Sequence, residues 1–168
     1  MAVRKVITWG DPRLKINSAD VGEWSPELDQ LVADLFETAR DEDGVGIAAP
    51  QVGININIAV VDSSCGVDPA ARIVLINPEI VRQEGSQVGS EGCLSIPGIH
   101  EVLERPKQVW VKNRLPDGSW VELEGEDLLA RAFCHEVDHL RGRLFGEYFG
   151  PVKRQFLQRR YNKQRSRE

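Results

Sequence analysis

The sequence predicts one α+β domain in which antiparallel β-sheets pack around a central helix with an HExxH motif. Three observations support this fold class. The chain has 168 residues, the size of one ordinary domain. Apolar residues recur at helical spacing near both ends of the chain, at residues 28–39 and 128–140. The strand-like segments between them follow one another without an intervening helix, which favours antiparallel pairing.

The first 20 residues are expected to form a partly extended arm that ends near Asp11 and Pro12. Ser25 then supplies a helix N-cap, and Pro26 is a favourable first helical residue. Apolar residues follow at helical spacing: Leu28, Leu31, Val32, Leu35, Phe36 and Ala39. An N-terminal amphipathic helix with its apolar face in the core is therefore predicted.

Residues 44–53, with the sequence GVGIAAPQVG, are rich in glycine and alanine and include a proline. This composition argues against a regular helix or strand and permits the close approach of another backbone. A phosphate-binding loop is excluded because no Gly-Lys-Ser/Thr is present. The segment is either a tight surface turn or one wall of a binding cleft, with Gln51 as the polar group that faces inward.

Strands are expected in the middle of the chain, where β-branched and aromatic residues gather between turn signals. Their ranges are 56–62, 72–77, 79–88, 108–114 and 120–124. The last two form a hairpin around the turn at residues 116–119. A second glycine-rich loop, residues 89–98, is expected between the third and fourth strands.

The helix at residues 128–141 carries the sequence His-Glu-Val-Asp-His and is expected to end at Gly142. His135 and His139 lie one turn apart on one face, where two imidazoles can hold one metal ion. Glu136 lies close enough to reach a water molecule on that ion without being a ligand itself.

Two histidines do not complete a metal site, so a third ligand is needed. The extended motif HExxHxxGxxH fails here because Phe145 occupies the position of the third histidine. Glu147 lies too near His139 for a separate helix to present it. Cys93 is the better candidate, because its glycine-rich loop can bring a thiolate to the helix. Cys134 projects about 100° away from the neighbouring histidine and is expected in the core.

Two imidazoles and a thiolate around a divalent ion leave one open coordination position. Water there loses much of its proton affinity, and Glu136 can take the remaining proton as the water attacks a carbonyl. The side-chain amide of Gln51 and the backbone N–H of Leu94 could stabilise the developing oxyanion. These residues predict a hydrolase for an amide or an ester.

Composition indicates a cytoplasmic globular protein, with 41% hydrophobic and 28% charged residues. No apolar run approaches the roughly 20 residues that span a bilayer, and no secretory or transit signal is expected at the N-terminus. Three cysteines without a CxxC pair argue against a disulfide framework and a four-cysteine zinc site. Among them, Cys65 is expected to have no role.

The basic tail, residues 152–168, contains seven Lys or Arg and one Glu, a net charge of +6. The other 151 residues carry −11 of the total of −5. A helix is expected here, with a narrow apolar stripe formed by Val152, Phe156 and Tyr161. This distribution favours a local docking site for an anionic partner over a body that coats nucleic acid, and no sequence-specific nucleic-acid binding is expected.

Three segments, taken together and in order, resemble the signature motifs of peptide deformylases. They are GVGIAAPQ at 44–51, EGCLS at 91–95 and HEVDHLRG at 135–142. The basic tail is similar to that of the bacterial long-tail class. The resemblance implies a single catalytic domain at residues 1–168 that removes the formyl group from N-formylmethionyl nascent peptides and releases formate.

The resemblance also implies a role for each motif residue. Cys93, His135 and His139 would bind one divalent metal ion, ferrous iron in the cell, with zinc or nickel as substitutes. Water on the metal would attack the formyl carbon, with Glu136 as general base and acid. Gln51 and the Leu94 backbone would hold the oxyanion. A thiolate ligand does not choose among these metals.

The substrate side of the site is expected to involve backbone and small residues. The Gly46 backbone would bind near the formyl group, and the peptide would add as a strand beside Gly44–Gly46. Leu128 and Ala132 could line a slot for the methionine side chain opposite Val45, although Leu128 could equally be core. A small formyl site would exclude an acetyl methyl group. Glu91 and Gly92, in the second motif, are also expected to border the substrate.

Some positions differ from the family pattern or allow two interpretations. His100 stands where some relatives carry Arg, so a contact from there to the peptide backbone is in doubt. Glu147 replaces a common Asp and is expected to affect packing. Asp138 could pair with Arg105 in support of the metal ligands. By resemblance, the tail could dock on the ribosome, and otherwise it is a solubilising helix.

Two rival functions fit parts of the sequence. A metal-dependent peptidase of another specificity would use the same HExxH helix. A non-catalytic module would use zinc only to stabilise the fold.

Overall fold

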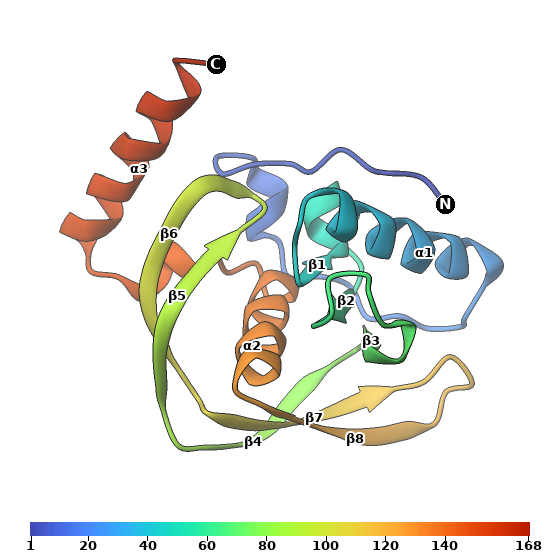
Figure 1. Ribbon diagram of the computed structural model, residues 1–168. Coiled ribbons are helices and arrows are strands. Elements are labelled where there is room, and N and C mark those ends of the chain that lie inside the picture. The colour runs from blue at the N-terminus through green and yellow to red at the C-terminus, as the bar shows by residue number, and fades with distance from the viewer.

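The computed structural model describes residues 1–168 as an α+β fold, in which three small antiparallel sheets surround a central helix (Figure 1). The central helix, α2 (Leu128–Leu140), carries the HExxH motif and contacts strands of all three sheets. Ten of its thirteen residues are buried, so this helix is the centre of the core. No helix in the structure is both long and apolar enough to cross a bilayer.

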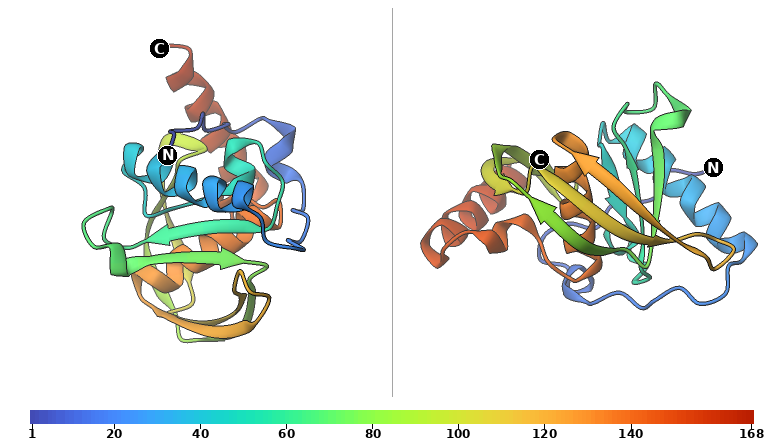
Figure 2. Two further views of the ribbon diagram at one scale, coloured as in Figure 1. Left: turned by 90° about the vertical axis from the view of Figure 1, so that its right-hand side faces the viewer. Right: turned by 90° about the horizontal axis from the view of Figure 1, so that it is seen from below.

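Helix α1 (Pro26–Asp41) begins where the sequence predicts, with Ser25 in extended conformation before Pro26. Its buried residues Leu31, Leu35 and Ala39 recur at helical spacing and pack with strands of the first sheet. The two views in Figure 2 show α1 on the opposite side of this sheet from α2. The predicted amphipathic helix is therefore confirmed.

The first sheet has the order β1-β2-β3, with bounds Gly46–Ala48, Ile58–Asp62 and Arg72–Ile76. The expectation of no regular strand within residues 44–53 is wrong, because β1 pairs with Ala59–Val61 of β2. Glycine is required at Gly46, since a Cβ atom there would lie 2.8 Å from the Val60 carbonyl oxygen. The close packing of β1 between β2 and α2 therefore explains the small residues of this segment.

The second sheet has the order β4-β7-β8, with bounds Glu79–Glu84, Gln108–Arg114 and Trp120–Glu126. The third is the hairpin of β5 (Gln87–Cys93) and β6 (Ile96–Arg105). Two predictions are corrected here. The strand expected at 79–88 is two strands separated by a turn at Gly85, whose φ is +67°. The expected loop at 89–98 is instead the end of β5, a tight turn and the start of β6.

Helix α3 (Pro151–Arg165) packs against β6 through Leu157 and Tyr161, which are each 1% exposed. The predicted apolar stripe is correct for Tyr161 but wrong for Val152 and Phe156, which are exposed. The helix is rotated so that Leu157, one residue after Phe156, takes the inward position. A helix is thus confirmed in the basic tail, with a different packed face.

Helix α2 begins after a strained residue. Asp127 has φ 52° and ψ −117°, a backbone conformation that residues with a Cβ atom rarely adopt. Its side chain makes no capping hydrogen bond to the helix. The Asp127 N–H donates to the carbonyl of Lys107, which fixes the sharp turn from β8 into α2.

Candidate metal centre

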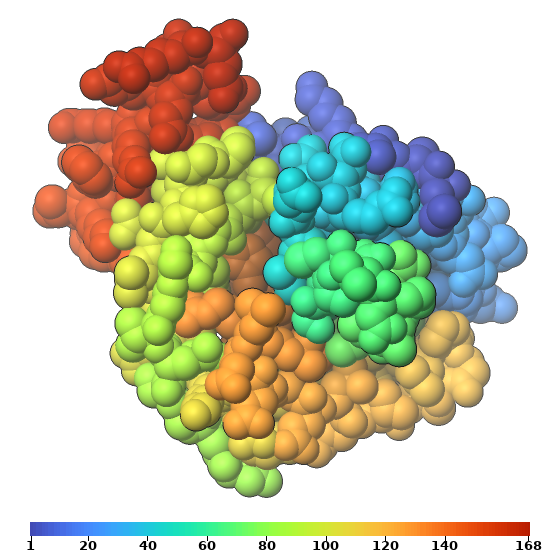
Figure 3. Space-filling view, viewed as in Figure 1, coloured from blue at the N-terminus to red at the C-terminus, as the bar shows by residue number.

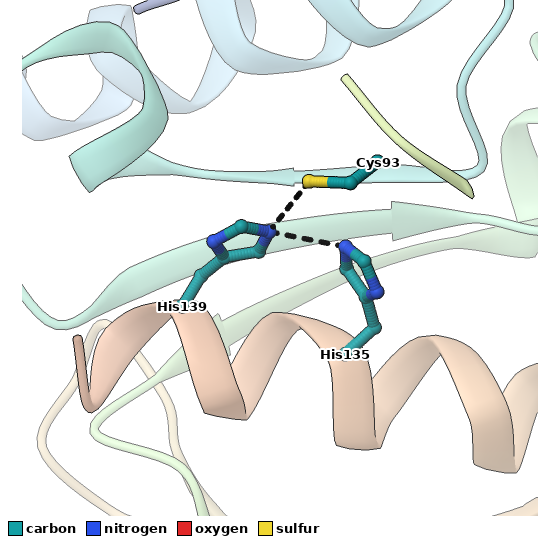
Figure 4. Close-up of side chains that lie close together, drawn as sticks. All are labelled: Cys93, His135 and His139. Carbon is teal, nitrogen blue, oxygen red and sulfur yellow. Dashed lines mark hydrogen bonds between the residues drawn. The ribbon is translucent and has the colours of Figure 1, made fainter. Parts of the chain in front are cut away.

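Cys93, His135 and His139 converge at the surface of α2 (Figure 4). Their donor atoms all lie within 4.8 Å of one another. The distance from Cys93 Sγ to His139 Nε2 is 3.3 Å, and the two Nε2 atoms lie 3.0 Å apart. None of the three residues is more than 9% exposed. The structure therefore brings the Cys93 thiol to two imidazoles that lie 42 and 46 residues later in the chain.

This donor set fits one divalent ion. In tetrahedral coordination, an ion roughly 2.0–2.1 Å from each imidazole nitrogen separates the two nitrogens by roughly 3.4 Å. The observed 3.0 Å lies close to that value. A thiolate and imidazole nitrogens are ligands common to iron, zinc and nickel sites, so this chemistry admits several metals.

Glu91 on β5 orients the His135 ring through Nδ1, the ring nitrogen that does not face the other two candidate ligands. Its carboxylate accepts a hydrogen bond from His135 Nδ1 at 2.8 Å and two from Arg105 at 3.0 and 2.7 Å. Burial raises the pKa of Glu91, but the hydrogen bonds and charges of His135 and Arg105 outweigh it and lower the pKa to about 2. Arg105 also pairs with Asp138 at 2.8 Å, which confirms the predicted pair. The ring of His135 is thus held by a buried charged network.

Glu136 faces the glycine-rich strand β1. A Cβ atom at Gly46 would lie 2.9 Å from Glu136 Oε1, so the carboxylate rests against the Gly46 backbone. Glu136 is 3% exposed, and its Oε2 atom has no hydrogen-bond partner. Burial raises the pKa of Glu136 to about 7. A carboxyl group with such a pKa can exchange a proton near neutral pH.

Gln51 lies in a short 3₁₀ helix after β1 and is 1% exposed. Its Oε1 accepts the Ala48 N–H at 2.9 Å, and its Nε2 donates to Ser95 Oγ at 3.2 Å. The same Nε2 lies 3.8 Å from Cys93 Sγ. The amide N–H groups of Gln51 therefore point toward the metal-ligand cluster.

A cavity of about 530 Å³ opens beside the cluster, visible in Figure 3 between the yellow-green hairpin, the cyan glycine-rich segment and the orange helix. Every site residue expected from the sequence lines it, except His139, which is buried behind the others. The lining set is Gly44, Val45, Gly46, Gln51, Glu91, Gly92, Cys93, Leu94, Leu128, Ala132, His135 and Glu136. Leu128 is half exposed and lines the cavity, so it is not a core residue.

Two further lining residues were not fully anticipated. Arg131, which lies outside the three motifs, donates to Glu91 at 3.2 Å and to the Leu103 carbonyl at 3.1 Å. Its position four residues before His135 is the signal that could have found it. His100 is exposed and lines the cavity with its ring against Gly92, where a Cβ atom would lie 2.6 Å from His100 Nε2.

The remaining cysteines lie outside the cluster, as expected. Cys65 is exposed in a turn and Cys134 is buried in the core. Burial raises the pKa of the Cys134 thiol to about 11, which keeps it protonated. Glu147 accepts the Leu144 N–H and thus has a local structural contact.

Comparison with known proteins agrees with this geometry. The polypeptide deformylase family model matches residues 3–155. The chain belongs to the polypeptide deformylase family. The peptide deformylase of Acidobacterium capsulatum is 44% identical over 163 residues, which cover 97% of this chain and 96% of that protein. The present chain is therefore similar over nearly its whole length to a curated deformylase.

Solved peptide deformylases share the fold. The structure from Legionella pneumophila has a TM-score of 0.91 at 37% identity and covers 98% of this chain and 96% of that one. A class I type b peptide deformylase from Acinetobacter baumannii, solved with Met-Ala-Ser bound, has a TM-score of 0.81 at 36% identity. That comparison covers 88% of this chain and 99% of the other.

Family membership makes the protein an enzyme, a hydrolase that deformylates N-formyl peptides in protein biosynthesis. The family is metal-dependent, and this chain has a group of residues that could hold a metal. Both rival interpretations, a peptidase of another specificity and a zinc-stabilised module without catalysis, are therefore set aside.

Proposed function

We propose that the protein removes the N-formyl group from N-formylmethionyl nascent peptides and releases formate. Cys93, His135 and His139 would hold one divalent ion, ferrous iron in the cell, for which zinc or nickel can substitute. The observation that carries the proposal is the convergence of these three donors within 4.8 Å at a cavity that Glu136 also lines. When bound, the ion would supply a Lewis acid that acidifies water and polarises the formyl oxygen.

Glu136 is the proposed general base and acid. Its carboxylate would take a proton from the attacking water and deliver it to the departing amine of methionine. The support is its buried position against Gly46, next to His135 and free of any partner at Oε2. Glu91 is the other buried carboxylate that lines the cavity, and it is already paired with Arg105.

Gln51 and Leu94 are the proposed oxyanion donors. The Gln51 side chain is fixed by Ala48 and points its amide at the cluster, and Leu94 follows Cys93 directly. Rigid donors of this kind stabilise charge that develops only in the transition state, so they raise the rate without tightening substrate binding.

The peptide is proposed to bind along β1. This strand is at the edge of its sheet, and its free side can accept an extended peptide beside Gly44–Gly46. Val45, Leu128 and Ala132 would then surround the methionine side chain. The Met-Ala-Ser bound to the Acinetobacter baumannii relative has the sequence expected of a deformylated product. Because the Gly46 backbone and Gly92 would form its walls, the formyl site would admit the hydrogen of a formyl group and exclude the methyl of an acetyl group.

The basic tail is proposed to dock on the ribosome, which would bring the enzyme to emerging chains in the cytoplasm. Helix α3 exposes Lys and Arg side chains and contacts the body mainly through β6. A surface of this charge attracts the RNA phosphates of a ribosome in a salt-dependent manner. Co-sedimentation with ribosomes at rising salt tests this part of the proposal, and a solubilising helix would show no binding.

The decisive experiment is an assay with formyl-Met-Ala-Ser, followed for both formate and peptide-bond cleavage. The anaerobically purified protein is expected to release formate in step with free Met-Ala-Ser, and its metal content identifies the ion. Cleavage after methionine, or no formate from protein with metal bound, would overturn the proposal.

A further inference from the structure

The N-terminal arm, defined here as residues 1–10, crosses the molecule from α1 to the tip of the β5–β6 hairpin (Figure 1). At its start, the Ala2 N–H donates to Asp34 on α1 at 2.9 Å, and Arg4 forms an ion pair with Asp34 at 2.8 Å. At its other end, Trp9 packs near Tyr161 with ring centroids 5.7 Å apart. Arg165 on α3 donates to Thr8 Oγ1 at 2.8 Å. The arm is therefore anchored at both ends.

The main chain of the arm also binds the two segments that flank the cavity, residues 44–53 and 90–98. The Ile7 N–H donates to the Gln51 carbonyl, and the Trp9 N–H donates to the Ser95 carbonyl, each at 2.8 Å. Only Thr8 separates the two donating residues along the chain, so their N–H groups lie at most roughly 7 Å apart. The arm therefore fixes the spacing of the two carbonyls that it binds.

The side chains of the same two residues, Gln51 and Ser95, also contact each other. Gln51 Nε2 donates to Ser95 Oγ at 3.2 Å, which closes a ring of hydrogen bonds from Ile7 to Gln51, Ser95 and Trp9. The walls belong to different sheets, and no backbone hydrogen bond joins residues 44–53 directly to 90–98. The arm is thus the main-chain connection between the segments that carry Gln51 and Leu94.

We propose that Ile7 and Trp9 are positioning residues, whose main-chain amides set the distance between the Gln51 side chain and the Cys93–Ser95 turn. This inference rests on the proposed function, in which Gln51 and the Leu94 N–H stabilise the oxyanion. Such donors act only at about 2.7–3.1 Å from the developing charge. A displacement of about 1 Å can lower a rate by roughly 10²-fold.

The test removes one of these amides. In Ile7→Pro, the hydrogen bond to Gln51 is lost, and kcat for formyl-Met-Ala-Ser is expected to fall at least about tenfold with little change in KM. The matched control is Lys5→Pro in the same arm, because Lys5 is exposed and its N–H makes no hydrogen bond. Its kcat should stay within about twofold of wild type. If Ile7→Pro lowers only Tm and keeps kcat, the arm merely stabilises the fold.

A double-mutant cycle separates positioning from general damage. In a Gln51→Ala background, Ile7→Pro should lower kcat much less than in wild type, because the group it positions is absent. Equal effects in both backgrounds would overturn the inference. Should Ile7→Pro fail to fold, an amide-to-ester change at Ile7 removes the same N–H and keeps the side chain, with the same expected results. Inactive wild type would refute the proposed function instead.

Discussion

The two sides of the cavity are built in different ways. Helix α2 contributes side chains, namely His135, Glu136 and Ala132, from a rigid element braced by the Glu91 and Arg105 network. The facing side, residues 44–46 and 90–98, contributes four glycines, at positions 44, 46, 92 and 98, together with Cys93 and Leu94. The proposed chemistry therefore depends on α2 and Cys93, whereas the shape of the cavity depends largely on the glycines opposite.

The largest effect is expected where the two sides meet at the metal ligands. Cys93→Ala should reduce bound metal from about one ion per chain toward none and abolish formate release, since two histidines alone hold an ion weakly. Metal analysis and the formate assay measure both. Cys134→Ala, which alters the neighbouring core cysteine, should keep its metal. Full metal content in Cys93→Ala would exclude the thiolate as a ligand.

The next effect concerns the chemistry of α2 alone. Glu136→Gln keeps the size of the side chain but cannot transfer a proton, so kcat should fall by roughly 10²–10⁴-fold. Metal content and thermal stability should be retained. If turnover persists in this variant, the proton is moved by another group and the assignment of Glu136 fails.

A substitution in the glycine-rich wall should lower activity by steric contact. Gly46→Ala would bring a Cβ atom to 2.8 Å from the Val60 carbonyl and 2.9 Å from Glu136 Oε1. Either β1 or Glu136 must move, and kcat/KM is expected to fall by roughly 10–10²-fold. Gly22→Ala is the control, because no atom lies within 4 Å of its Cβ position. Unchanged kinetics in Gly46→Ala would show that this wall tolerates a side chain.

A smaller effect is expected at the start of α2. Asp127→Gly should relieve the strained φ and ψ and raise the free energy of unfolding by about 1 kcal/mol, after the added entropy of glycine in the unfolded chain. Thermal unfolding should show a rise in Tm of roughly 2–4 °C. A lower Tm would mean that Asp127 stabilises the turn in another way.

The smallest effect concerns pH and the anchor of the N-terminal arm. Burial raises the pKa of Asp34, but hydrogen bonds from Gln30, Ala2 and Arg4 outweigh it and lower the pKa below 3.8. A lowered native pKa gives stability that is present above the unfolded pKa and lost as pH falls through the native pKa. The stability difference between wild type and Asp34→Asn should therefore shrink between pH 6 and pH 3. A constant difference would contradict the ionised role of Asp34.

The two sides also differ in how well the sequence predicts them. On α2, residues spaced by four share a face, so His135 and His139 could be paired from spacing alone. The β5–β6 hairpin could not be predicted from the sequence, because its glycines remove the alternating pattern that identifies strands. At Gly89 and Gly92, the side chains of Arg131 and His100 occupy the space that a Cβ atom would need. These contacts arise only in the tertiary structure. The exposed Phe156 was misjudged for a similar reason, since helix rotation is decided by the partner surface.

The backbone character of the glycine-rich wall has a consequence for inhibition. A compound that binds chiefly to the main chain of Gly44–Gly46 makes contacts that amino-acid replacement cannot remove, because every residue carries the same peptide group. Resistance to such a compound would have to arise at side chains of the rim. The half-exposed Leu128 is the position where a larger or branched residue could obstruct the compound at least cost to the fold.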